Sequence, residues 1–289
     1  MNPSDDLRLA LIQSKVTLDQ SHNIVNSVNA IRKAKSQHKA DLICLPEFFN
    51  SPYGKDYFES YAEEGPAEKT LSAQAISAVC KEEKVWVVAG SMPVREGGKI
   101  MNTSLTFNSN GEVVGKFSKL HLFDIDIPGQ FVFKESEMIT PGNSMCHFDM
   151  PTSDLSRKLR VGVGICYDMR FAELSLLYTQ ESGCQLLLFP GAFSTKTGPA
   201  HWELLSRARA LDNQCYVAAC APAYDEEAKY KSHAHSMIVH PWGNVMADAK
   251  ADETIISSDI DLCEVDKIRQ NFPLSHQRRG DIYTAVRKA

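Results

Sequence analysis

The sequence predicts an α/β protein built as a four-layer α-β-β-α sandwich. Strand-like and helix-like segments alternate along the 289 residues instead of forming separate blocks, which is typical of α/β architecture. After a looped middle the alternation begins again, and the segments ADLICLPEFF and CQLLLFPGAF, one in each half, both run from a buried strand through proline into a loop. These observations indicate two similar half-units, each a sheet with helices on one face. The helix-free faces are apolar, so packing them on each other gives the four layers.

Apolar periodicity predicts the elements of the first half. Continuous or alternating apolar runs indicate strands, and apolar residues three and four apart indicate helices. In order, the elements are a strand at 7–13, a helix at 20–38, a buried strand at 40–47, a helix at 66–84, a strand at 85–94 and two shorter strands around 101–108 and 112–120.

The second half repeats this pattern. Its elements are a strand at 159–166, a helix at 169–182, a strand at 184–190, a helix at 199–213, and strands at 215–223, 233–241 and near 254–261. No linker separates the halves, so residues 1–289 are predicted to form a single domain. The tail from about residue 263 shows little strand or helix pattern, and we expect it on the surface or at a subunit interface.

Composition argues against several classes of function. With 43% hydrophobic and 23% charged residues, the chain has a globular composition. Its formal net charge of -5 provides no basic field for phosphate backbones or anionic lipid, so we expect neither nucleic acid nor a membrane as a partner. An anionic ligand would have to be held by a few local cations inside a pocket.

The cysteines and the N-terminus indicate a reducing compartment. Eight cysteines are present, and even the closest pair, Cys215 and Cys220, is too widely spaced for a CxxC motif. The N-terminal stretch is acidic and lacks a long apolar segment, and no stretch approaches the roughly 18 apolar residues that span a membrane. The sequence therefore predicts a cytoplasmic protein and leaves a mitochondrial pool open.

One cysteine ends a buried strand, where α/β sheets place ligand sites. In LRVGVGICYDMRF, Cys166 precedes a helix-forming segment, and Gly162 and Gly164 allow neighbouring backbone to approach closely. The pattern resembles a nucleophile elbow, in which N–H groups beside the nucleophile receive an oxyanion. The alternative is one more buried core thiol. A tyrosine, an aspartate and an arginine directly after the strand argue against that alternative.

Two further strand ends carry chemically useful side chains. Glu47 precedes the loop FFNSPYG, where it would be either a pocket acid–base group or a surface charge that caps a helix. Lys119, in GKFSKLHLFD, would by itself more often be a solvated charge. Three strand ends that carry glutamate, lysine and cysteine together favour a catalytic site.

The motifs LPEFF, KFSKLHLFD and GICYDMRF resemble the Glu-Lys-Cys triad of the nitrilase superfamily, and the resemblance covers nearly the whole chain. FDIDIPG, FKESEMITPG and GAFSTKTGPAHWELLSRARALDNQ are similar to its omega-amidase branch. The resemblance implies the four-layer fold of the nitrilase type, a homodimer, and hydrolysis of the terminal amide of small dicarboxylic acid monoamides such as 2-oxoglutaramate and 2-oxosuccinamate. It implies no metal and no organic cofactor.

The resemblance also implies catalytic roles. Cys166 would be the nucleophile, Glu47 the general base, Lys119 the cation that stabilises the oxyanion, and Glu135 a second carboxylate of the pocket. The chemistry of these groups agrees, because a thiol with an ordinary pKa of about 8.5 needs a base and a nearby cation to attack an amide at neutral pH. Lys119 and the N–H of Tyr167 would face the oxyanion, and Lys119 would also keep the two buried carboxylates from repelling each other.

Arg170 resembles the residue that holds the far carboxylate of the substrate. Its planar guanidinium suits bidentate binding of a carboxylate, and it would bind a small anionic amide despite the negative net charge. The alternative is a surface ion pair with Asp168 or Glu173, which would contribute little to binding or stability.

Further pocket walls follow from the same resemblance. Tyr53 in SPYG, and Ala192 and Phe193 in PGAF, would line the substrate site, although Phe193 could equally be a core residue. The superfamily loop usually continues with asparagine, whereas this chain has Ser194 and Lys196. The effect of these two residues on substrate preference is left open.

Other motifs carry less weight. His233 and His235 could bind a metal from one strand face, but no third ligand cluster accompanies them, so no metal site is predicted. The glycosylation sequon at Asn102 would not be used in a cytoplasmic protein.

The motifs of the sequence leave three candidate functions. The first is an omega-amidase, the second a nitrilase or N-carbamoyl amide hydrolase of the same fold, and the third a catalytically silent scaffold protein. The triad together with Arg170 argues against a silent protein, because a scaffold has no physical need for such a set of desolvated groups. FDIDIPG and GPAHWELL favour the amidase over a nitrilase.

Overall fold

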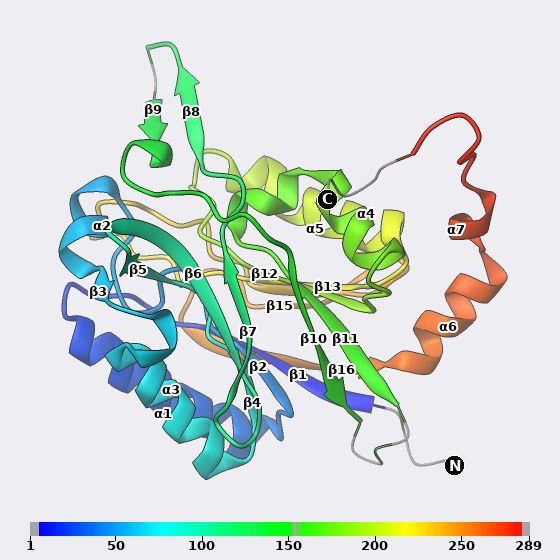
Figure 1. Ribbon diagram of the computed structural model, residues 1–289, viewed down its shortest axis with the longest axis horizontal. Coiled ribbons are helices and arrows are strands. Elements are labelled where there is room, and N and C mark those ends of the chain that lie inside the picture. Colours follow the sequence, from blue (N-terminus) through cyan, green and yellow to red (C-terminus); the bar gives the residue numbers. More distant parts are fainter. Residues whose placement is uncertain (1–5, 130, 153–154, 156, 285–289) are drawn as a thin grey trace.

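The chain folds into two facing sheets with helices outside each of them (Figure 1). The computed structural model describes residues 6–129, 131–152, 155 and 157–284. The larger sheet has the order β16 (Thr254–Asp261), β1 (Asp6–Gln13), β2 (Leu42–Cys44), β4 (Trp86–Val88), β6 (Lys99–Phe107), β5 (Met92–Glu96) and β3 (Glu63–Glu64), and β7 (Val113–Ser118) also pairs with β6. The second sheet has the order β10 (Cys146–Pro151), β11 (Lys158–Val163), β12 (Leu186–Pro190), β13 (Tyr216–Cys220), β14 (Met237–Val239) and β15 (Val245–Asp248).

The core between the sheets is apolar and continuous. Leu9 and Leu11 of β1 belong to the same buried cluster as Val161 of β11 and Val217 of β13. The thiol of Cys220 also bridges the two layers. The predicted packing of two helix-free faces on each other is therefore confirmed.

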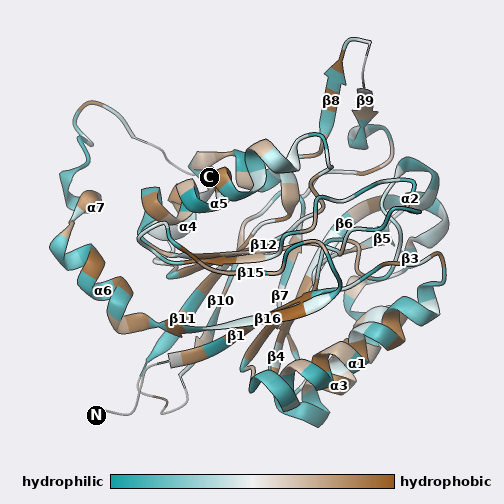
Figure 2. Ribbon diagram, turned by 180° about the vertical axis from the view of Figure 1, so that it is seen from behind, coloured by the Kyte–Doolittle hydropathy of each residue, from teal (hydrophilic) through white to brown (hydrophobic). Residues whose placement is uncertain are grey.

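The helices cover the outer faces of the sheets. α1 (Gln20–His38) and α3 (Leu71–Glu83) lie on the larger sheet, while α4 (Ala172–Gln180) and α5 (Gly198–Asn213) lie on the second sheet (Figure 1). Both α1 and α3 mix hydrophilic and hydrophobic residues (Figure 2), and apolar side chains such as Ile31 and Ile76 are buried against the sheet. Asp19 and Thr70 cap their N-termini by accepting hydrogen bonds from His22 N and Ala73 N, so local sequence sets where these helices begin.

The two halves have the same internal order. β1, β2 and β4 are parallel neighbours connected through helices, and β11, β12 and β13 repeat this arrangement in the second sheet. Parallel strands place their carboxyl ends at one edge of a sheet. The loops that follow β2, β11 and β12 carry Glu47, Cys166 and Ala192.

Two predicted strands of the first half are shorter than expected. The strand predicted at 85–94 is split into β4 and β5, because Gly90 turns the chain with a φ of 46° and lies so close to Pro46 O that a Cβ would be only 1.9 Å away. The strand predicted at 40–47 ends at Cys44. Glu47 therefore lies in a turn beyond the strand, with more freedom to aim its side chain than a strand residue has.

The middle of the chain is less looped than predicted. It contains β10 and a separate hairpin of β8 (Asp124–Ile127) and β9 (Phe131–Lys134), which projects beyond the sheets in Figure 1. β10 is an edge strand whose Phe148 and Met150 point inward, an alternation that is easily missed between polar residues. The short helix α2 (Lys55–Tyr61) was not predicted either.

The C-terminal segment is partly helical, which corrects the prediction of an unpatterned tail. α6 (Leu262–Asn271) begins at Asp261, whose side chain accepts hydrogen bonds from Cys263 N and Glu264 N. Val265 and Ile268, three residues apart, are buried. α7 (Leu274–Gln277) follows, and both helices lead away from the sandwich (Figure 1). Throughout the described ranges, no helix is long and apolar enough to cross a membrane.

Candidate active site

The site contains two backbone turns with unusual conformations. Cys166 has a φ of 49° and Phe48, directly after Glu47, has a φ of 52°, a region that side chains other than glycine seldom occupy. At Gly191 a Cβ would lie 3.1 Å from the Cα of Cys166, so the neighbouring strand end approaches the cysteine closely. A sharp turn does follow the strand at Cys166, but it continues as a 3₁₀ turn, Cys166–Arg170, and α4 begins only at Ala172 instead of near residue 169.

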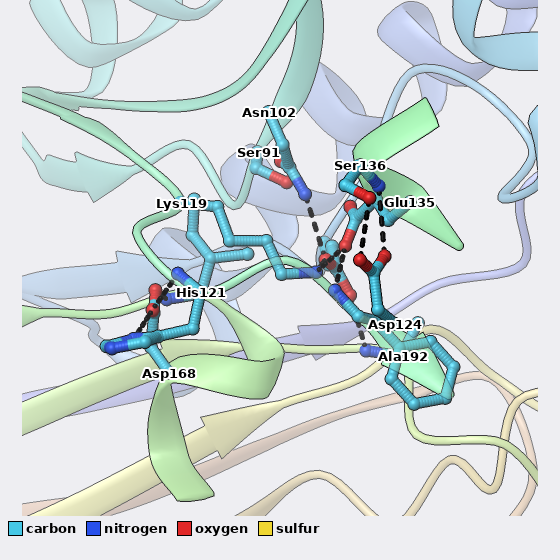
Figure 3. Close-up of polar contacts among 12 residues, drawn as sticks. Ser91, Asn102, Lys119, His121, Asp124, Glu135, Ser136, Asp168 and Ala192 are labelled. Carbon is cyan, nitrogen blue, oxygen red and sulfur yellow. Dashed lines mark hydrogen bonds and ion pairs between the residues drawn. The ribbon is translucent and has the colours of Figure 1, made fainter. Parts of the chain in front are cut away.

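Glu47 is held by donors from three parts of the chain. It is 1% exposed, and its Oε1 accepts hydrogen bonds from Asn102 Nδ2 at 2.9 Å and from Lys119 Nζ at 3.0 Å. Its Oε2 accepts one from Ala192 N at 2.8 Å. Asn102, Lys119 and Ala192 converge in this way in Figure 3. Such a set of donors fixes the carboxylate and stabilises its charge in a buried place.

Lys119 bridges two buried carboxylates. Its Nζ lies 3.0 Å from Glu47 Oε1 and 2.8 Å from Glu135 Oε2, and all three side chains are inaccessible to solvent (Figure 3). Burial by itself lowers the pKa of Lys119, but the negative charges of Glu135 and Glu47 outweigh it and raise the pKa well above the ordinary value. Burial raises the pKa of Glu135, against the opposing effect of Lys119. Lys119 therefore carries its charge at neutral pH.

Cys166 lies beside this ion pair network. Its side chain is buried, and the charge of Glu47 acts on its thiol. Burial raises the pKa of the Cys166 thiol well above its usual range, the charge of Glu47 raises it further, and Lys119 lowers it. The sulfur is therefore a protonated thiol at neutral pH, with a carboxylate within reach of its proton.

A narrow pocket of about 10 Å³ opens onto the thiol. It brings together Cys166 and four of the five predicted substrate-binding residues, Tyr167, Arg170, Ala192 and Phe193, but not Tyr53. Its remaining walls are Phe123, Ser194, Thr197 and Tyr230. Ser194 thus lies in the wall, whereas Lys196 is exposed and lies outside the lining.

Arg170 lies between two aromatic rings and a histidine. Its guanidinium carbon lies 4.6 Å from the centre of the Phe193 ring and 5.3 Å from that of Tyr167, and its Nη1 lies 3.1 Å from His201 Nδ1. Within the described ranges no carboxylate forms an ion pair with Arg170, and its Nε is buried without a hydrogen-bond partner. Phe193 also packs against Trp202, so it is both a core residue and a pocket wall.

A second, wider cavity of about 400 Å³ reaches Glu47 from another side. Tyr53 lies in its wall together with Phe48, Ala192 and Tyr230. Burial raises the pKa of the Tyr53 hydroxyl well above its ordinary value, with Glu135 and Glu47 adding to the shift. Tyr53 therefore keeps its proton and presents a neutral hydroxyl group to the cavity.

Sequence reasoning missed several groups of this site. Asn102 was considered only as a sequon, yet it is fully buried and donates to Glu47. Asp168 accepts from His121 N at 2.9 Å and from Ile165 N at 2.9 Å, so it ties the segment after Lys119 to the residue before the nucleophile. A polar asparagine within the apolar strand pattern of β6 was the available signal. The contact of Ala192 uses its backbone, which leaves no signal in the side chain.

The histidine pair at 233 and 235 serves a structural purpose. The rings of His233 and His235 stack at 4.6 Å, and His235 Nδ1 lies 3.1 Å from Asp248 Oδ1. The expected strand at 233–241 is restricted to β14, because Ala234 and His235 both have positive φ angles. No group of three or more possible metal ligands is found where the chain is described.

Comparison with known proteins agrees with this geometry. The sequence model of the carbon-nitrogen hydrolase family matches residues 8–270. The omega-amidase NIT2 of Mus musculus is 49% identical over 281 residues, which cover 97% of this chain and 98% of that protein, and the omega-amidase NIT2 of Bos taurus is 50% identical with the same coverage. The crystal structure of Nit3 from Saccharomyces cerevisiae, a member of the nitrilase superfamily, has a TM-score of 0.83 and 37% identity over 95% of this chain and 97% of that one. The chain therefore belongs to the carbon-nitrogen hydrolase family of the nitrilase superfamily.

Proposed function

We propose that this protein is an omega-amidase that hydrolyses the terminal amide of small dicarboxylic acid monoamides, such as 2-oxoglutaramate or 2-oxosuccinamate, through a thioester on Cys166. The observation that supports the proposal is the narrow pocket, which is lined by the thiol of Cys166 and by Arg170, a guanidinium that has no carboxylate partner among the described residues. The names of the relatives favour an amidase over a nitrilase.

The first half of the reaction forms the thioester. Glu47 takes the proton of Cys166 while the sulfur bonds to the amide carbon, because a thiol with a raised pKa is not ionised beforehand. The oxyanion is stabilised by Lys119 and by the N–H of Tyr167, each worth about 3 kcal/mol in comparable sites. Glu47 then passes its proton to the nitrogen, the C–N bond breaks, and ammonia leaves.

The second half releases the acid. Glu47 accepts a proton from water while the water oxygen bonds to the thioester carbon. The C–S bond then breaks and the proton returns to the sulfur. Glu47 serves both halves because its remaining donors, Asn102 and the amide of Ala192, hold it in place throughout.

Lys119 makes this use of Glu47 possible. Two desolvated carboxylates without a cation between them would not both ionise, and Glu47 would then be a weaker base. Glu135 acts as the second carboxylate of the pocket and holds Lys119 through the 2.8 Å contact. Lys119 therefore both stabilises the oxyanion and maintains the charge state of the base.

Arg170 selects the substrate. Its guanidinium faces the pocket of Cys166 without a carboxylate partner, so the far carboxylate of the substrate supplies the missing one. Tyr167, Ala192 and Phe193 provide the walls between the two ends of the ligand.

We also propose that residues 1–289 act as a single domain, that the protein is cytoplasmic, and that it forms a homodimer.

The proposed dimer interface includes a groove of about 750 Å³ between α4, α5 and the segment after residue 263. Three large apolar residues of this groove, Leu211, Trp242 and Phe272, have 53%, 51% and 55% of their surface exposed to solvent. Apolar exposure of this kind supports an interface that includes the C-terminal segment. Light scattering on the purified protein should give twice the monomer mass of 32.2 kDa.

The experiment that tests the activity is a screen for ammonia release over dicarboxylic monoamides, nitriles and N-carbamoyl amino acids, with the parent and Cys166→Ala. We expect activity on the monoamides, an acyl adduct on the parent by intact mass, and neither in Cys166→Ala, whose fold should be unchanged. Preference for nitriles or carbamoyl compounds would identify another activity of the same fold. Activity in Cys166→Ala would refute the nucleophile.

A further inference from the structure

Two neighbouring cavities are lined by the reacting groups. Cys166 and Arg170 line the narrow pocket, and Glu47 and Tyr53 line the wide cavity. The two linings share the walls Ala192 and Tyr230. Tyr230 is fixed there, because its hydroxyl donates to Ala192 O at 2.6 Å. The nucleophile thus lines one cavity and the base lines the other.

We infer that the wide cavity is the compartment through which water enters and ammonia leaves, while the acid chain occupies the narrow pocket. The inference rests on the proposed function and specifies how its two steps use the site. Ammonia departs when the C–N bond breaks. Water then approaches Glu47, its oxygen bonds to the acyl carbon, one proton passes to Glu47 and on to the sulfur, and the C–S bond breaks.

With the acyl chain in place, the narrow pocket has no room left for the hydrolytic water. Its volume of about 10 Å³ has room for roughly one water molecule. An acyl chain that stretches from Cys166 toward Arg170 must displace that water and push the side chains apart. The hydrolytic water must therefore come from elsewhere, and the cavity of about 400 Å³ leads directly to the base.

The wide cavity contains polar groups that suit water and ammonia. Ser51 and Tyr53 are 1% and 8% exposed and line the cavity, and their hydroxyl groups have no hydrogen-bond partner among the described residues. A buried hydroxyl group without a partner is costly. Both oxygen atoms are buried, so a small shift of either side chain toward the cavity would let a water molecule satisfy it.

The charged residues that line the two cavities favour different reactants. Asp225 and Glu227 line it, and its cation, Lys229, is paired with Asp56. Free carboxylates at this side attract ammonium and repel an anionic substrate, whereas Arg170 attracts the substrate on the other side. The two cavities therefore have opposite electrostatic preferences.

Filling the wide cavity tests the inference. Ala228→Trp and Val16→Trp introduce bulk from two different walls, so that one variant remains if the other does not fold. Glu226→Trp is the matched control, because Glu226 is exposed on the same loop but does not line the cavity. The measurements are kcat with 2-oxoglutaramate, the decay of acylated Cys166 by rapid-quench intact mass after dilution, and the inhibition constant of 2-oxoglutarate.

We expect both cavity variants to lower kcat and the rate of acyl decay by about five-fold or more, while the inhibition constant changes by less than about two-fold. The control should match the parent. Unchanged acyl decay, or a parallel loss of inhibitor binding, would overturn the inference while the parent still acylates. A parent that never acylates Cys166 would instead overturn the proposed function, and the inference with it.

Discussion

Replacing Lys119 by glutamine tests the contribution of the positive charge separately from that of the packing of the side chain. The side chain is fully buried and contacts Glu47 and Glu135 at 3.0 and 2.8 Å. Glutamine is similar in length and can still donate hydrogen bonds, but it carries no charge. Among the described residues no other positive charge contacts these two carboxylates, so the variant removes their cation and leaves most of the packing in place.

The structure sets the size of the effect on stability. Removing one partner of a buried ion pair costs about 3–5 kcal/mol, because the remaining charge is left uncompensated. At roughly 2–4 °C in Tm for each 1 kcal/mol, Lys119→Gln should lower Tm by about 6–20 °C. Protonation of Glu135, whose pKa is already raised by burial, would bring the loss toward the lower end.

The effect on catalysis should be larger and should fall on kcat. Loss of one oxyanion donor costs about 100- to 1,000-fold in kcat. The assay is steady-state kinetics with 2-oxoglutaramate, alongside thermal unfolding of the same preparations. The double variant Lys119→Gln with Glu135→Gln is the control, because it removes one negative charge as well and should recover part of the lost Tm without recovering kcat.

Two results would refute this reasoning. A change confined to KM would mean that Lys119 only binds the ground state. Recovery of kcat in the double variant would mean that charge balance, and not stabilisation of the oxyanion, is its whole contribution.

Three further predictions follow from the contacts of the site. Arg170→Ala should lower kcat/KM for 2-oxoglutaramate by about 10- to 100-fold and leave a neutral amide of similar length nearly unaffected, whereas equal losses would indicate a structural residue. Asn102→Leu should lower kcat by about 10-fold or more with little change in KM, because Glu47 loses a buried donor at 2.9 Å; an unchanged kcat would contradict this positioning role. Alkylation of Cys166 by iodoacetamide should be slow at neutral pH and should accelerate as pH rises toward the raised pKa of the thiol, and a fast, pH-independent reaction would instead indicate a preformed thiolate.

The four-layer fold was predictable because it depends on patterns within short segments. Apolar runs and capping residues such as Asp19 and Thr70 define the strands and helices locally. The repeat of these elements in two halves then leaves few ways to bury the helix-free faces. Family membership was predictable for a similar reason, since Glu47, Lys119 and Cys166 each stand in a distinctive local motif, and the family match confirms it.

The sequence was less informative where a short or polar pattern was completed by distant contacts. The tail appeared unpatterned although Asp261 and Glu264 form a helix start, and the hairpin of β8 and β9 has only partly buried or exposed side chains in β8 to reveal it. Gly90 splits a continuous apolar run because Pro46, far away in sequence, occupies the space where a strand residue would have its Cβ.

By itself, then, the sequence determined the fold class and the family and pointed to the residues proposed as catalytic, because each is encoded within a few neighbouring residues. Only the tertiary structure decided which groups share a compartment. Asn102 and Ala192 contact Glu47 across 55 and 145 residues of chain, and the backbone amide of Ala192 would be present whatever its side chain. Burial likewise arises only when the layers close, and it is burial that raises the pKa of Cys166, on which the proposed role of Glu47 as its base depends.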